Sequence, residues 1–90
     1  MIRLLTDAER AALAKKSELL KQGGFKYRID REIYVNREKK KLISREYVED
    51  HSPEELELRI SQPGRTNGWN YIFNFEPSDS AKRELESALD

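Results

Sequence analysis

Ninety residues suffice for one small domain and leave no room for a second independent hydrophobic core. The chain contains no cysteine, which excludes disulfide bonds and thiolate metal sites and favours a reducing compartment. Its 17 basic and 17 acidic residues balance, so a net charge of zero provides no long-range attraction to nucleic acid or to an anionic membrane. The N-terminal residues lack the apolar core of a signal peptide, and we expect one domain over 1–90, located in the cytoplasm without membrane contact.

The first predicted element is a helix over 7–22. Thr6 and Glu9 have the spacing of a capping box, in which each side chain accepts from the backbone amide of the other residue. Apolar side chains recur at helical spacing along this segment, as expected for a helix with one buried face. Gly23 and Gly24 end the helix, because glycine readily adopts the left-handed conformation found beyond a helix C-terminus.

Strict alternation of apolar and polar residues over 25–35 predicts a strand with one buried and one wet face. The odd-numbered positions are apolar, from Phe25 to Val35, except for Arg31, which indicates a bulge, a bend or a charge directed at a partner. A polar turn over 36–41 follows, and 42–49 is predicted as a second strand, although its apolar residues do not keep a single phase.

The segment 52–62 carries two conflicting signals. Ser52-Pro53 with Glu55 is typical of a helix start. Leu56, Leu58 and Ile60, however, alternate with polar residues, which is strand spacing. We expect a turn of helix or a tight loop over 52–55 and a strand over 56–62, with a short helix running to Ile60 as the alternative.

After a loop rich in turn-forming residues, aromatic residues alternate from Trp69 to Phe75 and predict a strand. Pro77 ends it, and Ser78 or Asp79 begins a final helix with Ala81, Leu85, Ala88 and Leu89 on one stripe. The predicted architecture is α+β, a four-stranded antiparallel, meander-like sheet with an N-terminal and a C-terminal helix packed on one face. The opposite face of the sheet would then be exposed.

That exposed face is the leading candidate site, and its predicted function is non-catalytic binding of a partner protein or of a second copy. Tyrosine and arginine contribute strongly to protein interfaces. We expect the contact to involve Arg28, Arg31, Glu32 and Tyr34.

A basic hairpin supports an alternative, binding of single-stranded nucleic acid. Such a surface would neutralise phosphates with basic side chains and stack bases on an aromatic ring. Acidic residues interrupt this segment, which favours a solvated strand face instead. The basic residues concerned are Lys26, Arg37, Lys39, Lys40 and Lys41.

Three further features carry less specific signals. The loop from Pro63 to Gly68 has the glycine pattern of neither a P-loop nor a dinucleotide-binding motif. We expect Trp69 behind it to be buried, together with Tyr71, Phe73 and Phe75 at the alternate positions that follow. His51 is the only histidine; it has no neighbouring ligand pattern for a metal, and we expect it to be exposed in a loop. No cofactor is implied. A small ribonuclease is the remaining enzyme hypothesis, with candidate residues Arg28, Arg31, Arg45 and His51.

Overall fold

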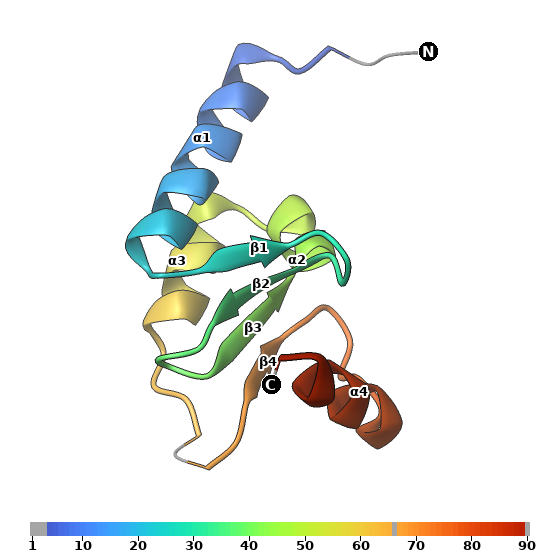
Figure 1. Cartoon of the computed structure of the whole chain (residues 1–90). Coiled ribbons are helices and arrows are strands. Elements are labelled where there is room, and N and C mark those ends of the chain that lie inside the picture. The colour runs from blue at the N-terminus through green and yellow to red at the C-terminus, as the bar shows by residue number, and fades with distance from the viewer. Residues whose placement is uncertain (1–3, 66, 90) are drawn as a thin grey trace.

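The computed structural model describes residues 4–65 and 67–89, which form four helices and four strands in an α+β arrangement (Figure 1). In chain order the elements are α1 (Asp7–Gln22), β1 (Lys26–Arg28), β2 (Ile33–Asn36), β3 (Lys41–Ser44), α2 (Arg45–Asp50), α3 (Pro53–Ser61), β4 (Asn70–Ile72) and α4 (Asp79–Leu89).

The sheet has the strand order β1-β2-β3-β4 and is mixed. The first three strands are antiparallel neighbours, whereas β4 runs parallel to β3 and pairs Tyr71 with Leu42. The predicted all-antiparallel meander is therefore wrong at its last strand. The strands β3 and β4 can be parallel because the connection between them contains α2 and α3 and is long enough for the crossover that a parallel pair requires.

The predicted strand over 25–35 is a hairpin, with β1 and β2 joined by a turn over 29–32. Tyr27 pairs with Tyr34 in this hairpin, so an odd position in β1 faces the same side as an even position in β2. Val35, next to Tyr34, therefore lies on the face opposite to Tyr27, although both occupy odd positions in the alternating sequence. Glu32 completes the turn with a φ of 52°, in the left-handed region.

The segment 53–61 is helix α3, so the predicted strand is wrong and the helical alternative is confirmed. Ser52 caps it, since its Oγ accepts from the Glu55 amide at 3.2 Å, and Pro53 occupies the first turn. Leu56 is fully buried, whereas Leu58, two positions later, is 62% exposed.

The predicted second strand, 42–49, divides into β3 and α2. Ser44 ends the strand and caps the helix, accepting from the Tyr47 amide at 3.0 Å. The helix prediction for 7–22 is confirmed, and both hydrogen bonds of the Thr6–Glu9 capping box are present. The final helix also begins as expected, because Ser78 Oγ accepts from the Ala81 amide at 3.2 Å.

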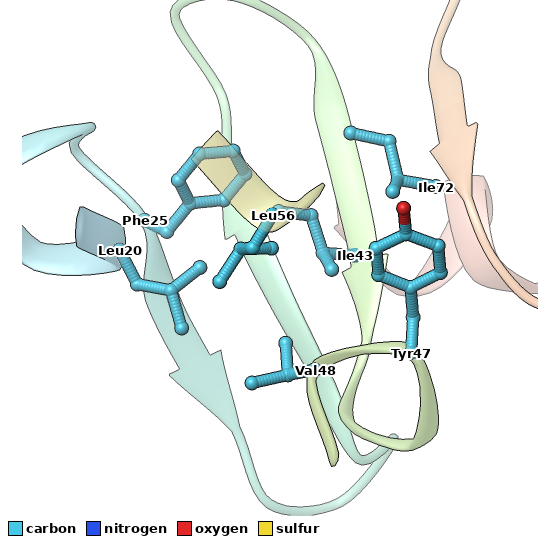
Figure 2. Packing of buried hydrophobic residues seen from close by; sticks show 7 residues of the cluster. All are labelled: Leu20, Phe25, Ile43, Tyr47, Val48, Leu56 and Ile72. Atoms are coloured by element: carbon cyan, nitrogen blue, oxygen red, sulfur yellow. The ribbon is translucent and has the colours of Figure 1, made fainter. Parts of the chain in front are cut away.

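Apolar clusters lie on both faces of the sheet, because adjacent residues of β3 point in opposite directions. Ile43 belongs to the first cluster, which α1, α2 and α3 cover, and Leu42 to the second, which α4 covers through Leu85 and Leu89. Figure 2 shows the first cluster: Leu20, Phe25, Ile43, Tyr47, Val48, Leu56 and Ile72. The two terminal helices thus cover opposite faces, and the prediction that both lie on one face is wrong.

The aromatic segment after residue 68 forms a strand only over 70–72. Its alternate positions Trp69, Tyr71 and Phe73 are partly buried against the second cluster, as predicted for that phase. Phe75 lies beyond the strand and is 80% exposed, contrary to the prediction. Ile72 faces the other way and is buried in the first cluster.

Candidate protein-binding groove

Helix α1 is held against the rest of the protein at its middle and its C-terminal end. Lys15 Nζ lies 3.4 Å from Glu54 on α3, and Lys16 Nζ donates to the Val48 carbonyl of α2 at 2.6 Å. Leu20 is the one α1 residue that is buried. The N-terminal half of the helix rises away from the sheet (Figure 1).

A groove of about 650 Å³ separates this half of α1 from the β1–β2 hairpin and α2. We call it the α1–hairpin groove. Its apolar lining comes from both sides: Ala12 and Leu13 on α1 with Leu5 just before it, and Tyr27, Ile29 and Tyr34 on the hairpin.

Two tyrosines form the hairpin wall of the groove. The rings of Tyr27 and Tyr34 have centroids 4.8 Å apart and are tilted by 48°, a favourable aromatic geometry. Tyr34 is partly buried and packs against the first cluster, whereas Tyr27 is 40% exposed. Burial, with a smaller effect of Tyr27, raises the pKa of Tyr34 above its ordinary value, so Tyr34 presents a neutral phenol at physiological pH.

Charged residues of both signs surround the apolar lining: Glu9 and Lys16 on α1, and Arg45 and Glu49 on α2. Arg45 is held in place, since its Nε donates to Glu49 at 2.8 Å and its guanidinium also lies 3.3 Å from Glu32. The hydrogen bond with Glu49 raises the pKa of Arg45 further above its already high value. An apolar floor with such a rim is suited to an amphipathic segment.

The groove also collects the exposed apolar surface of the protein. Among the described residues seven large apolar side chains are exposed, and four of them line the groove. Ile29, at 82%, is the most exposed of these four. Contiguous exposed apolar surface bounded by polar residues is typical of an interaction site. The four are Leu5, Leu13, Tyr27 and Ile29.

The structure does not bring the predicted partner-binding residues together on one free sheet face. Arg28 donates to the Ala88 carbonyl at 2.7 Å, and Arg31 lies 2.7 Å from Glu84, so both contact α4.

Tyr34 instead lines the α1–hairpin groove, and Glu32 reaches its edge through Arg45. The four predicted residues are thus divided between α4 and the groove.

The five predicted nucleic-acid-binding residues are divided as well. Lys41 is 6% exposed, and its Nζ donates to the carbonyls of Ile60 at 2.6 Å and Gln62 at 2.8 Å, at the end of α3. Arg37 donates to the Leu89 carbonyl of α4.

Lys26 and Arg37 line a separate hollow beside β1. Lys39 and Lys40 are exposed on the turn between β2 and β3.

His51 is engaged on both ring nitrogens. Nδ1 lies 2.7 Å from Glu55 and Nε2 lies 2.9 Å from Asn74, while the ring stacks on Tyr47 at a centroid distance of 3.9 Å. It therefore joins the start of α3 to the segment after β4. His51 lies in the short loop between α2 and α3, as predicted, but it is half-buried rather than exposed. Neither nitrogen is available to a substrate in this arrangement.

The sequence interpretation missed the residues that make the groove apolar. Leu13 fitted a buried helix face and Ile29 a buried strand face, and only the turn over 29–32 places Ile29 outside the core. The departure of Arg31 from the alternation was the available signal, because it marks that turn.

Over residues 4–65 and 67–89 no helix is long and apolar enough to cross a membrane. The same ranges contain no group of three or more acidic, histidine or cysteine side chains suited to a metal ion. Comparison with known proteins finds no matching family model, no matching curated protein and no matching solved structure.

Proposed function

We propose that this protein is a protein-interaction module whose α1–hairpin groove receives an amphipathic helix. The observation that carries the proposal is the gathering of Leu5, Leu13, Tyr27 and Ile29 around one open hollow. A helix laid into an apolar groove buries one face and leaves its polar face in water, which is a recurrent mode of protein recognition.

The energetics favour such binding. Complete burial of a leucine or isoleucine side chain contributes roughly 1.5–3 kcal/mol, and Ile29 and Leu13 still have most or half of that burial to gain. Tyr27 and Arg45 add the two residue types that most often dominate interface energies. Arg45 is already oriented by Glu49, which lowers the entropic cost of its ordering on binding.

The nucleic-acid and ribonuclease alternatives have less support. Each cationic residue of the ribonuclease hypothesis lies beside a carboxylate: Arg28 beside Asp30, Arg31 beside Glu84, Arg45 beside Glu49 and His51 beside Glu55. Paired charges attract phosphate weakly, because a phosphate must displace the carboxylate.

Site-specific photo-crosslinking in the native cell tests the proposal. A photoreactive phenylalanine analogue replaces Leu13 in the groove or, as a control, Leu58, which is an exposed leucine on α3. We expect a protein adduct of defined mass from position 13 and none from position 58. Absence of an adduct at 13, or equal adducts at both positions, would refute the groove as the binding surface.

A further inference from the structure

We infer that the helix occupying the α1–hairpin groove is α1 of a second copy, packed antiparallel across a two-fold axis between Ala12 and Leu13. This inference rests on the proposed function and names its partner. A two-fold axis requires one surface to be complementary to itself. Helix α1 meets this requirement because it forms one wall of the groove and carries the exposed Leu13, while the exposed Leu5 lies just before its N-cap, Thr6.

Charge fixes the register. Glu9 and Lys16 both line the groove and lie symmetrically about the midpoint of Ala12 and Leu13. They are separated by two helical turns, about 10 Å along the axis. An antiparallel two-fold pair therefore places Glu9 of each copy beside Lys16 of the other, giving two opposite-charge pairs.

The centre of the interface has complementary side-chain sizes. The axis brings the small Ala12 of one helix opposite the larger Leu13 of the other, twice. A small residue facing a large one lets two helices approach closely while the larger side chain fills the space. The hairpin wall of Tyr27 and Ile29 then covers the flank of the incoming helix.

Like charges at the same register do not oppose this pairing. The two-fold also relates Arg10 to Lys15, but each is displaced by about 100° around the helix from Glu9 or Lys16, on opposite sides of the groove-facing stripe. Neither lines the groove, and Lys15 is directed at Glu54 on α3. The net charge of zero adds no long-range repulsion between two copies.

Charge reversal with mixing tests the inference. Sedimentation equilibrium of the full chain, up to about 1 mM, should show a reversible monomer–dimer equilibrium. Glu9→Lys and Lys16→Glu should each weaken dimerisation about ten-fold or more, because each creates two like-charge pairs. An equimolar mixture of the two variants should restore the dimer, since both cross-pairs are again opposite in charge.

Matched controls separate this effect from damage to the fold. Lys15→Glu makes the same charge change one residue outside the groove and should alter the dissociation constant by less than about three-fold. The comparison of Lys15→Glu with Lys16→Glu remains decisive even if Glu9→Lys, which loses its capping-box carboxylate, fails to fold. Lys16→Met loses the hydrogen bond to the Val48 carbonyl without adding a negative charge, so it should weaken dimerisation less than Lys16→Glu does. A monomeric wild type, equal effects of these two lysine variants, or no rescue by mixing folded variants would overturn the inference.

The outcomes also distinguish this inference from the proposed function. A chain that stays monomeric but is crosslinked through position 13 to a different protein retains the groove and loses the second copy as its occupant. An adduct of twice the mass of the chain supports both. Absence of any adduct, together with a monomeric chain, rejects both.

Discussion

The Nδ1 atom of His51 lies 2.7 Å from Oε2 of Glu55, while its Nε2 atom lies 2.9 Å from Oδ1 of Asn74. Asn74 donates through Nδ2 to Asp50 at 2.8 Å, which leaves its oxygen to accept from the histidine. Both ring nitrogens of His51 therefore donate, as only the protonated imidazolium can. The contact is a charged link between α2, α3 and the segment after β4.

This link predicts a stability that depends on pH. The hydrogen bond to Glu55 raises the pKa of His51 above 6.5, supported by Asn74 and opposed by burial. Because the pKa is higher in the folded state, His51 contributes to the free energy of unfolding fully below pH 6.5, and this contribution is lost as the pH rises through the folded-state pKa. Thermal unfolding should show this fall in wild type and not in His51→Gln. Parallel pH profiles for the two proteins would contradict the assignment.

Leu56 and Leu58 provide a matched pair on α3. Leu56→Ala should lower the free energy of unfolding by about 2–5 kcal/mol, because it leaves a cavity in the first cluster. Leu58→Ala, at an exposed position of the same helix, should change it by less than about 0.5 kcal/mol. Denaturant unfolding measures both. Similar losses would instead favour the strand predicted from the sequence alternation.

Lys41 is predicted to stabilise the end of α3 rather than to bind phosphate. Lys41→Met retains the apolar stem but removes the ammonium from the carbonyls of Ile60 and Gln62, which should cost about 1–3 kcal/mol. Lys40→Met, at the exposed neighbouring position, should stay within about 0.5 kcal/mol of wild type. Equal unfolding midpoints for the two variants would show that the buried contact contributes nothing.

Alanine substitutions in the two halves of α1 should have different effects on stability. Leu20→Ala should cost about 2–5 kcal/mol, since Leu20 is 4% exposed in the first cluster. Leu13→Ala, measured at a concentration where the chain is monomeric, should cost less than about 1 kcal/mol because the side chain is half exposed. A large loss at Leu13 in the monomer would mean that the N-terminal half of α1 belongs to the core.

Local signals predicted α1 completely, because the Thr6–Glu9 capping box and the following glycines are contained in the segment itself. The hairpin was not predictable from alternation alone. The alternation of apolar and polar residues continues through the turn over 29–32, although odd-numbered side chains lie on opposite faces of the sheet before and after it. The turn positions 31 and 32 are arginine and glutamate, not the glycine or asparagine typical of a tight turn.

Segment 53–61 shows competition between two local signals. The cap formed by Ser52 and Pro53 prevailed over the alternation of Leu56, Leu58 and Ile60, because a helix of this length needs only Leu56 and part of Ile60 on its buried side. Because 53–61 is a helix and not a strand, it also forms part of the crossover that makes β4 parallel to β3.

The candidate site depends on contacts between segments distant in sequence. Tyr34 alone among the four predicted partner-binding residues lines the α1–hairpin groove. Arg28 and Arg31 were selected for a free sheet face, but α4 covers that face and accepts both side chains. The face of the sheet that a terminal helix covers is determined by tertiary packing, and the local sequence of the helix or the strand does not specify it.

A cysteine near the proposed axis provides the most direct test of the α1–α1 interface, because the native chain has no cysteine to compete. Leu13→Cys lies beside the axis, and Leu58→Cys offers a comparably exposed thiol on α3. Under mild oxidation Leu13→Cys should form a disulfide-linked dimer much faster than Leu58→Cys. An excess of Lys16→Glu protein, which should pair poorly with the Leu13→Cys chain, should not slow this oxidation. Equal or slower oxidation at position 13 would contradict a two-fold contact centred on Ala12 and Leu13.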